Sequence, residues 1–367
     1  MRKYPLAKPE VTQEDIDAVT SVLKSSELSR GPIVKEFEQA ICRAVKSEYA
    51  CAVSSGTAGL IMALQALGVQ ARDEVITVSF TVPATVNSII AVGATPMMID
   101  IEPQTLGMCP VALKKSITHK TKAIIVVHAF GKATKIAEII NIAKQHDIPV
   151  IEDACEAIGN RYKDKHLGTF ADIGVFAFYP NKQITSGEGG MLVTNNKQYD
   201  EKFKLLRNHG RTMNGDLYDQ ISFGWNFRMS DINAALCLSQ LKRLSQIIKK
   251  RQQISNWYYE NLEDVDEVIC PQFSKSEPQS AWFVYVIRLL TTDREAVITD
   301  MQNQGIQCGR YFAPVHLQPF YRDKFPDLKP QVTEEIASQC LALPFYNELT
   351  RENVEFICSE LKNIVRR

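Results

Sequence analysis

Short apolar runs of strand length alternate with amphipathic helical segments through the first half of this chain. The runs are bounded by Gly, Pro or polar residues, which is typical of buried strands. This alternation predicts an α/β fold, with a mostly parallel central sheet flanked by helices. The expected strands are Tyr49–Val53, Glu74–Val78, Thr95–Ile101, Lys122–Val127, Ile148–Glu152, Ile173–Phe178 and Met191–Thr194, and the expected helices are Glu14–Lys24, Pro32–Val45, 60–67, Pro83–Val92, Lys135–His146 and Lys197–Arg207.

The pattern changes after residue 229. Residues 230–262 read as one helix of more than about 25 residues, longer than most globular helices, and we expect it to link two domains. The segments expected beyond it are a strand at Trp282–Leu290 and helices at Arg294–Gln304, Thr333–Leu341 and Arg351–Leu361. We therefore predict a large α/β domain at residues 1–245 and a smaller C-terminal α+β domain at residues 246–367.

The charge balance and the cysteines exclude several classes of partner. Lys+Arg and Asp+Glu both number 42, so no bulk attraction to nucleic acid or to an anionic membrane is expected. The nine cysteines include no C-x-x-C pair and predict reduced thiols in a cytoplasmic protein. No apolar run reaches about 18 residues and no secretory h-region is present, so we expect no membrane span and no export. The six histidines show no paired ligand spacing, so no metal is expected.

Polar residues follow several of the expected strands. They are Ser54 to Thr57, His128, Asp153 and Lys182. Ligands of parallel sheets bind beyond the carboxyl ends of the strands, so these residues are expected to converge on one rim. A loop lysine near a strand-end acid suits carbonyl chemistry, because the amine can form a Schiff base and the acid can hold a positively charged ring nitrogen.

Each of these residues also has a plain structural interpretation. Lys182 is an ordinary solvated loop lysine on that interpretation, although a Gly-rich turn after an apolar strand gives such a lysine no benefit. On the same interpretation, Asp153 is a helix cap, and Ser54 to Thr57 are an ordinary helix N-cap and not a phosphate-binding loop. The residues alone leave these alternatives open.

Five motifs together resemble a known family. They are SSGTAGL (54–60), IEDACEAIG (151–159), the stretch GTFADIGVFAFYPNKQITSGEGGMLVTN (168–195), RNHGR (207–211) and GWNFRMSDINAALCLSQLKRL (224–244). The combination is similar to the DegT/StrS-type sugar aminotransferases, which are fold-type-I pyridoxal-phosphate enzymes. The resemblance runs from about Gly31 to Leu244 and returns weakly at residues 311–316.

The resemblance implies pyridoxal 5′-phosphate as the cofactor and assigns roles around it. Lys182 becomes the Schiff-base lysine and the proton shuttle, and Asp153 pairs with the pyridine nitrogen. Gly56 and Thr57, with Ser55 in the same loop, would bind the cofactor phosphate. Asn226 matches the family position that reaches the phosphate of the neighbouring subunit, which implies a homodimer with shared active sites.

The implied reaction is ping-pong transamination. An amino acid, usually glutamate in this family, would give its amino group to the cofactor, which then aminates a keto sugar. Relatives act mostly on nucleotide-linked hexoses, in amino-sugar and surface-polysaccharide biosynthesis. Four residues fall in regions that line the family's substrate cleft, namely Arg30, His209, Arg228 and His316. For the two histidines and Arg228, a loop or interface contact is an equal alternative.

Three positions depart from the family pattern. Val82 stands where relatives carry an aromatic residue that stacks on the cofactor ring. Ala177 stands where a Ser usually donates to the phosphate, and losing that bond would weaken binding by roughly 1.5–3 kcal/mol. Glu156 replaces the Gln or His that lies beside the ring. The segment His128 to Lys132 also differs from the common form, which leaves a keto sugar acid without a nucleotide open as the substrate.

Three other functions are alternatives to a sugar aminotransferase. A pyridoxamine-dependent sugar dehydratase would carry His in place of Lys182, which argues against that activity. A non-catalytic regulator or scaffold that retains the fold is compatible with the three departures. A nicotinamide dehydrogenase is disfavoured, because no G-x-G-x-x-G motif follows an early strand.

Overall fold

The computed structural model describes residues 3–212, 219–271 and 280–366 of the chain. Its larger sheet has seven strands in the order β1-β9-β8-β5-β4-β2-β3. The pairs β2–β3, β2–β4, β4–β5 and β5–β8 are parallel, and only β9 runs against its neighbours. The strands are β1 Tyr49–Val53, β2 Glu74–Val78, β3 Thr95–Ile99, β4 Thr121–Val127, β5 Val150–Asp153, β8 Ile173–Ala177 and β9 Gly190–Thr194.

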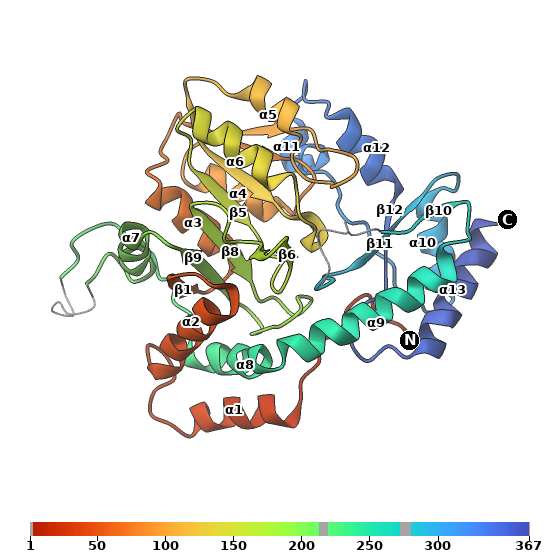
Figure 1. Cartoon of the computed structure of the whole chain (residues 1–367), viewed down its shortest axis with the longest axis horizontal. Helices are drawn as coiled ribbons and strands as arrows, with labels where there is room; N and C mark the ends of the chain where they lie inside the picture. Colours follow the sequence, from red (N-terminus) through yellow and green to blue (C-terminus); the bar gives the residue numbers. More distant parts are fainter. Residues whose placement is uncertain (1–2, 213–218, 272–279, 367) are drawn as a thin grey trace.

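Helices cover both faces of this sheet (Figure 1). Buried side chains of α3, α4 and α7 form one core with strand residues such as Val175 and Leu192. On the opposite face, α2 and α8 pack over Phe176 and Met191, and α5 and α6 pack over β2 and β4. Successive strand residues therefore enter different cores, as the two-residue period of a strand requires. The predicted α/β architecture is confirmed.

Most predicted helices are present with ends shifted by at most two residues, but α3 begins four residues earlier and α13 ends four residues later than predicted. The short helices α5 and α11 and the 3₁₀ turns were not predicted. The helices are α1 Gln13–Leu23, α2 Pro32–Val45, α3 Gly56–Ala66, α4 Pro83–Ala91, α5 Pro110–Ser116, α6 Ile136–Gln145, α7 Lys197–Arg207, α8 Asp231–Lys242, α9 Leu244–Leu262, α10 Arg294–Asn303, α11 Pro319–Arg322, α12 Gln331–Gln339 and α13 Arg351–Val365, with 3₁₀ turns at Ala129–Gly131 and Val315–Leu317.

The single helix predicted over residues 230–262 is wrong in one respect. It is two helices, α8 and α9, which meet at Arg243 with φ −108° and ψ 13°. The Arg243 guanidinium donates to Asp15 Oδ2 at 2.8 Å and to the Glu10 carbonyl at 3.0 Å, so the N-terminal segment holds this junction. Beyond the break, α9 runs from beside the large sheet toward α13 and the C-terminus (Figure 1).

A second sheet lies in the C-terminal part of the chain. Its three antiparallel strands are β10 Val268–Ile269, β11 Tyr285–Leu289 and β12 Cys340–Leu343. The helix predicted to reach Leu341 ends at Gln339, because the buried run that follows pairs with β11. A third, two-stranded sheet joins β6 Arg161–Tyr162 to β7 Lys165–His166. Tyr4 packs in the core around β11, so the first residues of the chain join its last part.

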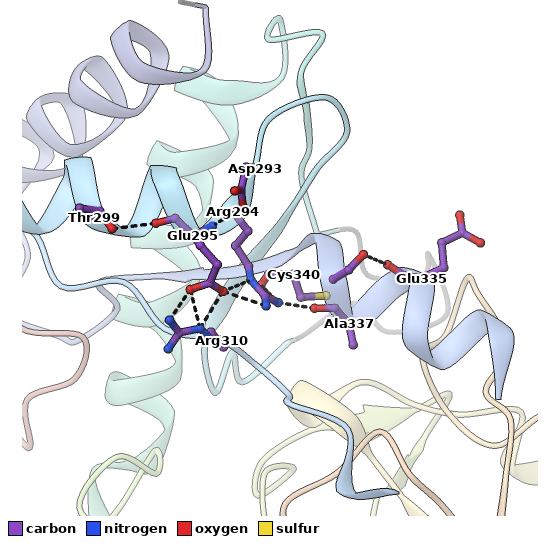
Figure 2. Close-up of polar contacts among 9 residues, drawn as sticks. Asp293, Arg294, Glu295, Thr299, Arg310, Glu335, Ala337 and Cys340 are labelled. Carbon is purple, nitrogen blue, oxygen red and sulfur yellow. Dashed lines mark hydrogen bonds and ion pairs between the residues drawn. The ribbon is translucent and has the colours of Figure 1, made fainter. Parts of the chain in front are cut away.

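A network of arginine and carboxylate side chains connects the start of α10 to α12 and to the first residue of β12 in the three-stranded sheet (Figure 2). Arg310 Nε donates to both carboxylate oxygens of Glu295, at 2.8 and 2.9 Å. Arg294 donates to Glu295 Oε1 at 3.1 Å and also bonds the Ala337 carbonyl at the end of α12. The hydrogen bonds from Arg310 lower the pKa of Glu295 to about 2. The network joins three segments that are distant in sequence.

Within the described ranges, 3–212, 219–271 and 280–366, no helix is both long and apolar enough to cross a bilayer.

Candidate active site

Two neighbouring acids end strand β5, and their side chains point to opposite faces of the sheet, as successive strand residues do. Glu152 is fully buried, and its two oxygens accept four hydrogen bonds. The donors are His128 Nε2 at 2.8 Å, Gly168 N at 2.8 Å, Phe170 N at 2.6 Å and Ala171 N at 2.8 Å. His128 follows its strand as predicted, but its side chain is also fully buried and contacts Glu152. This pair anchors a loop and does not line a cleft.

Asp153 is also buried, but it has fewer partners. Thr85 Oγ1, in the first turn of α4, donates to Asp153 Oδ2 at 2.8 Å, and Thr81 Oγ1 lies 2.9 Å from the Thr85 hydroxyl. The other oxygen, Oδ1, accepts a longer bond from Cys155 N at 3.3 Å. A carboxylate has about four acceptor positions, so Asp153 keeps capacity for a charged donor such as a protonated ring nitrogen. Sequence reasoning missed Thr85, which lies 68 residues before Asp153.

Lys182 lies in a tight turn that leaves β8. Its backbone N–H donates to the Tyr179 carbonyl at 2.9 Å. The next residue, Gln183, donates from Nε2 to the Glu156 carbonyl at 2.8 Å. Two residues further, Thr185 N donates to Gln240 Oε1 of α8 at 2.9 Å. These bonds fix the turn against the loop after β5 and against α8, so the Lys182 side chain starts from a rigid base.

The Lys182 amine is enclosed. Its Nζ lies 3.4 Å from Glu156 Oε1, and the two side chains are 11% and 10% exposed. The second Glu156 oxygen accepts from Phe130 N at 2.8 Å. The Phe283 ring centroid lies 4.1 Å from Nζ, a cation–π distance. Burial raises the pKa of the Glu156 carboxyl, and the charge of Lys182 acts in the opposite direction.

The C-terminal part of the chain supplies one wall of this enclosure. Phe283 is buried above the amine, and the Tyr311 hydroxyl accepts from Asn181 Nδ2 at 3.3 Å. Arg251 of α9 donates to the carbonyls of Trp282 at 2.6 Å and Phe283 at 2.8 Å, which fixes the position of Phe283. Tyr311 belongs to the weak motif at 311–316, but nothing in the sequence around Phe283 marks it as a site residue.

The end of β1 forms a cradle suited to a phosphate. Helix α3 starts at Gly56, and Ser55 Oγ accepts from Ala58 N at 3.1 Å, so the Ser55 hydroxyl is an N-cap. A Cβ at Gly56 would lie 2.9 Å from both Ala177 Cβ and Cys155 Sγ, so only glycine leaves room there. Free N–H groups and the helix dipole at such a terminus favour a phosphate.

These groups together fit pyridoxal phosphate. Lys182, Asp153 and the start of α3 all follow strands that run in one direction, so the amine, the carboxylate and the phosphate cradle share one edge of the sheet. Thr57 is half-buried in the first turn of α3. Val82 is the N-cap residue of α4 and is 40% exposed, without a ring to stack on a cofactor.

The substrate candidates are placed in two groups. Arg30 and His209 have left-handed backbones, with φ of 62° and 57°, a conformation that clusters at functional sites when the residue is not glycine. Arg228 donates to Asn208 Oδ1 at 3.0 Å. Burial lowers the pKa of Arg228, and the positive charges of Arg30, Arg207 and Arg211 lower it further, so all three lie within electrostatic range of Arg228.

His316 is placed differently, since it is only 2% exposed. Its Nδ1 lies 2.6 Å from Ser79 Oγ, and its Nε2 lies 3.1 Å from Glu334 Oε1. Both ring nitrogens therefore already have partners within the fold. The histidine joins the end of β2 to α12, and its role toward a substrate stays a prediction.

Asn226 is exposed in a segment that runs along the end of β1. Ser54 N donates to the Phe227 carbonyl at 2.8 Å, and Arg228 bridges to Val53. The Trp225 and Phe227 rings stack at 5.1 Å, which stiffens the segment. The side chain of Asn226 is thus presented to solvent from a fixed backbone beside the phosphate cradle. Among the residues that the structure describes, no group of three His, Cys, Asp or Glu side chains is placed to hold a metal.

Comparison with known proteins agrees with this geometry. Residues 9–362 match the DegT/DnrJ/EryC1/StrS aminotransferase family. The protein MJ1066 of Methanocaldococcus jannaschii is 35% identical, over 98% of this chain and 97% of its own.

Two solved structures extend the agreement to the fold. Helicobacter pylori PseC, an aminotransferase of pseudoaminic acid biosynthesis, superposes with a TM-score of 0.94 at 28% identity, covering 99% of both chains. Streptococcus pneumoniae Spr1654 in its PLP form gives 0.93 at 26% identity, covering 99% of this chain and 98% of its own, and it was also solved in a PMP form.

The predicted family, fold class, cofactor and enzyme class, a pyridoxal-phosphate-dependent sugar aminotransferase, are confirmed by these matches. By sequence along nearly its whole length and by fold, the chain belongs to the DegT/DnrJ/EryC1/StrS aminotransferase family.

Proposed function

We propose that the protein transfers the amino group of L-glutamate to a nucleotide-linked keto sugar, in the cytoplasm, for amino-sugar and surface-polysaccharide biosynthesis. One observation carries this proposal. The amine of Lys182, the carboxylate of Asp153 and the open start of α3 lie on one sheet edge, and they match the aldehyde, ring nitrogen and phosphate of pyridoxal phosphate. The nine free thiols support the cytoplasm as the location.

Each site residue then has a defined task. Bound pyridoxal phosphate supplies an electron sink that stabilises negative charge on the carbon that loses its proton. Lys182 would attach the cofactor and, once displaced by the amino donor, move the proton between the two reacting carbons. Asp153 would hold the ring nitrogen protonated, and Thr85 keeps that carboxylate oriented. Phe283 and Tyr311 exclude water from one side of the amine.

The arginines near the site support an anionic sugar substrate, which accepts the amino group. Arg228 lies within electrostatic range of Arg30, Arg207 and Arg211, and it is only partly buried. Guanidinium groups bind the oxygens of a diphosphate in two-point contacts. A nucleotide-linked sugar brings such a diphosphate, while a free sugar acid would bring a single carboxylate. The cluster therefore favours the nucleotide-linked substrate.

We also propose that the protein is a homodimer in which Asn226 completes the partner's site. Asn226 is exposed beside the phosphate cradle, and Ile221 and Phe223 of the same segment are 63% and 58% exposed. Exposed apolar side chains that gather beside a functional residue favour a covered surface. A two-fold dimer would bury these side chains and would place each Asn226 in the other subunit's site.

The cofactor and substrate are tested on the purified protein. Borohydride treatment of cofactor-loaded protein should attach the cofactor irreversibly to Lys182, where it serves as a label for peptide mapping. A peptide map with this label elsewhere, or nowhere, overturns the proposal. Glutamate with a panel of nucleotide-linked keto sugars and free keto sugar acids should then release 2-oxoglutarate with the nucleotide-linked class. Turnover with the free acids alone would contradict the assigned substrate.

The shared site is tested by mixing two variants. In heterodimers of Lys182→Ala and Asn226→Asp chains, one site carries both changes and the other carries neither. Randomly exchanged chains should recover up to about one quarter of wild-type activity, since half the dimers are mixed and each has one intact site of two. No recovery from two poorly active parents would show that Asn226 serves its own chain.

A further inference from the structure

Lys182 and Glu156 form a buried pair of opposite charges with little access to water. Their side chains are 11% and 10% exposed, and Nζ lies 3.4 Å from Oε1. Phe283 covers the amine at 4.1 Å from its ring centroid, and Phe130 N holds the far carboxylate oxygen at 2.8 Å. A buried charge is stable only while its partner is charged, so the two groups are electrostatically coupled.

Resting on the function proposed above, we propose that Glu156 stores the proton of Lys182. While the lysine is a free ammonium, Glu156 is a carboxylate. When Nζ bonds to a carbonyl carbon, one water leaves and the ammonium proton passes to Glu156 Oε1, which becomes a carboxylic acid. Glu156 keeps this proton while the displaced Lys182 acts as a neutral base, and Oε1 returns it when the amine again stands alone in the site. The atoms and charges balance within the pocket, and no proton crosses to solvent.

The other titratable groups that face Glu156 favour this exchange. Asp153 is near enough to raise the pKa of the Glu156 carboxyl by repulsion, and burial raises it more. Cys155 and Tyr311 also interact with it electrostatically, and burial raises the pKa of both, so both stay neutral and neither changes the charge balance. Lys182 supplies the stabilising positive charge. Once that charge is lost, a lone carboxylate beside Asp153 in a dry pocket takes up a proton.

The first test needs no cofactor. Infrared difference spectra at neutral pH should show a carboxylic acid C=O band in Lys182→Ala that is absent from wild type and shifts in D₂O. Lys182→Arg keeps the positive charge and should lack the band. The double variant Lys182→Ala/Glu156→Gln should lack it too, which assigns it to Glu156. A missing band in Lys182→Ala, or an equal band in Lys182→Arg, overturns the proposal.

The second test uses cofactor-loaded protein. Loaded minus cofactor-free wild type should show the same acid band, and Glu156→Gln should not. Glu102→Gln is the matched control, because Glu102 is likewise a mostly buried carboxylate held by a backbone N–H, near Lys135 at 4.0 Å, and it does not contact Lys182. It should keep the band. A band that persists in Glu156→Gln overturns the proposal.

The two tests also separate this inference from the function on which it rests. Borohydride labelling of Lys182 in wild type reports cofactor attachment independently of any proton. Label on Lys182 without the acid band rejects the proton store and keeps the aminotransferase. The band in cofactor-free Lys182→Ala, with no label on Lys182 in wild type, keeps the proton store and rejects the attachment.

Discussion

Glu152 and Asp153 are neighbours at the end of one strand, yet their surroundings differ in kind. Glu152 accepts four hydrogen bonds from a histidine and three backbone N–H groups. Asp153 accepts one good bond from Thr85 and a longer one from Cys155 N. A carboxylate whose acceptor positions are filled by the fold stabilises the fold, whereas one that the fold leaves partly unpaired is available to a ligand. Four substitutions test this difference, in order of decreasing expected effect.

Asp153→Asn should mainly remove activity. The amide cannot hold the ring nitrogen protonated, so we expect kcat/KM to fall about 10³-fold, which is about 4 kcal/mol of transition-state stabilisation. Steady-state kinetics with saturating cofactor measure this loss. Thermal unfolding of the cofactor-free variant should change little, and a large drop in its Tm would show that Asp153 is structural after all.

Glu152→Gln should mainly remove stability. The neutral amide weakens the bonds from three backbone donors and leaves a buried donor facing one of them, so we expect the free energy of unfolding to fall by about 3 kcal/mol. Urea unfolding of the cofactor-free protein measures it. Activity per folded molecule should remain within about two-fold of wild type. A thousand-fold loss of kcat in well-folded variant protein would erase the contrast with Asp153.

Thr85→Val should reduce the contribution of Asp153 to catalysis without abolishing it. One hydrogen bond to a charged group is lost at nearly constant volume, which we expect to reduce kcat/KM by about 1.5 kcal/mol, or roughly ten-fold. The cofactor absorbance should become more sensitive to pH, because the ring nitrogen is held less firmly. Thr85→Ser restores the hydroxyl and should recover most of the activity; no recovery would point to packing instead.

Glu295→Gln tests a surface carboxylate whose two oxygens both accept hydrogen bonds within the fold. Glu295 is 46% exposed, so the expected loss of stability is below about 1 kcal/mol and smaller at high salt. The arginines lower its pKa to about 2 from 4.5, so the stabilisation is complete above pH 4.5 and disappears as the pH falls toward 2. Urea unfolding at several pH values should show wild type and variant converging in acid. A constant difference would contradict the ion pair as its source.

The sequence predicted the sheet and its rim because both depend on local periodicity. Apolar runs located all seven large-sheet strands to within two residues at their ends, and the strand order brought Lys182 and Asp153 to one edge. The family resemblance assigned Asp153 to the cofactor, but periodicity alone could not show which of the two β5 acids the fold leaves partly unpaired, since that depends on how the strand is rotated in the sheet. The break at Arg243 was missed for a similar reason, because Asp15 holds it from over 200 residues away.

The residues that enclose the Lys182 amine could not be predicted from the sequence. Phe283 contacts Lys182 across about 100 residues, through a backbone that Arg251 holds. Thr85 contacts Asp153 from another helix. Such contacts depend on tertiary packing and leave no periodic trace, so only the weak motif around Tyr311 hinted that the C-terminal part reaches the site.

The hold of Arg251 on the carbonyls of Trp282 and Phe283 limits how this enzyme can open. A flap motion that lifted Phe283 away from the lysine would break two charge-assisted hydrogen bonds inside a buried site. We therefore expect Trp282 and Phe283, of which Phe283 covers the amine, to move together with α9 as one rigid unit. A bulky sugar has to approach from a side that Phe283 does not cover, where Tyr179 and Val82 are exposed.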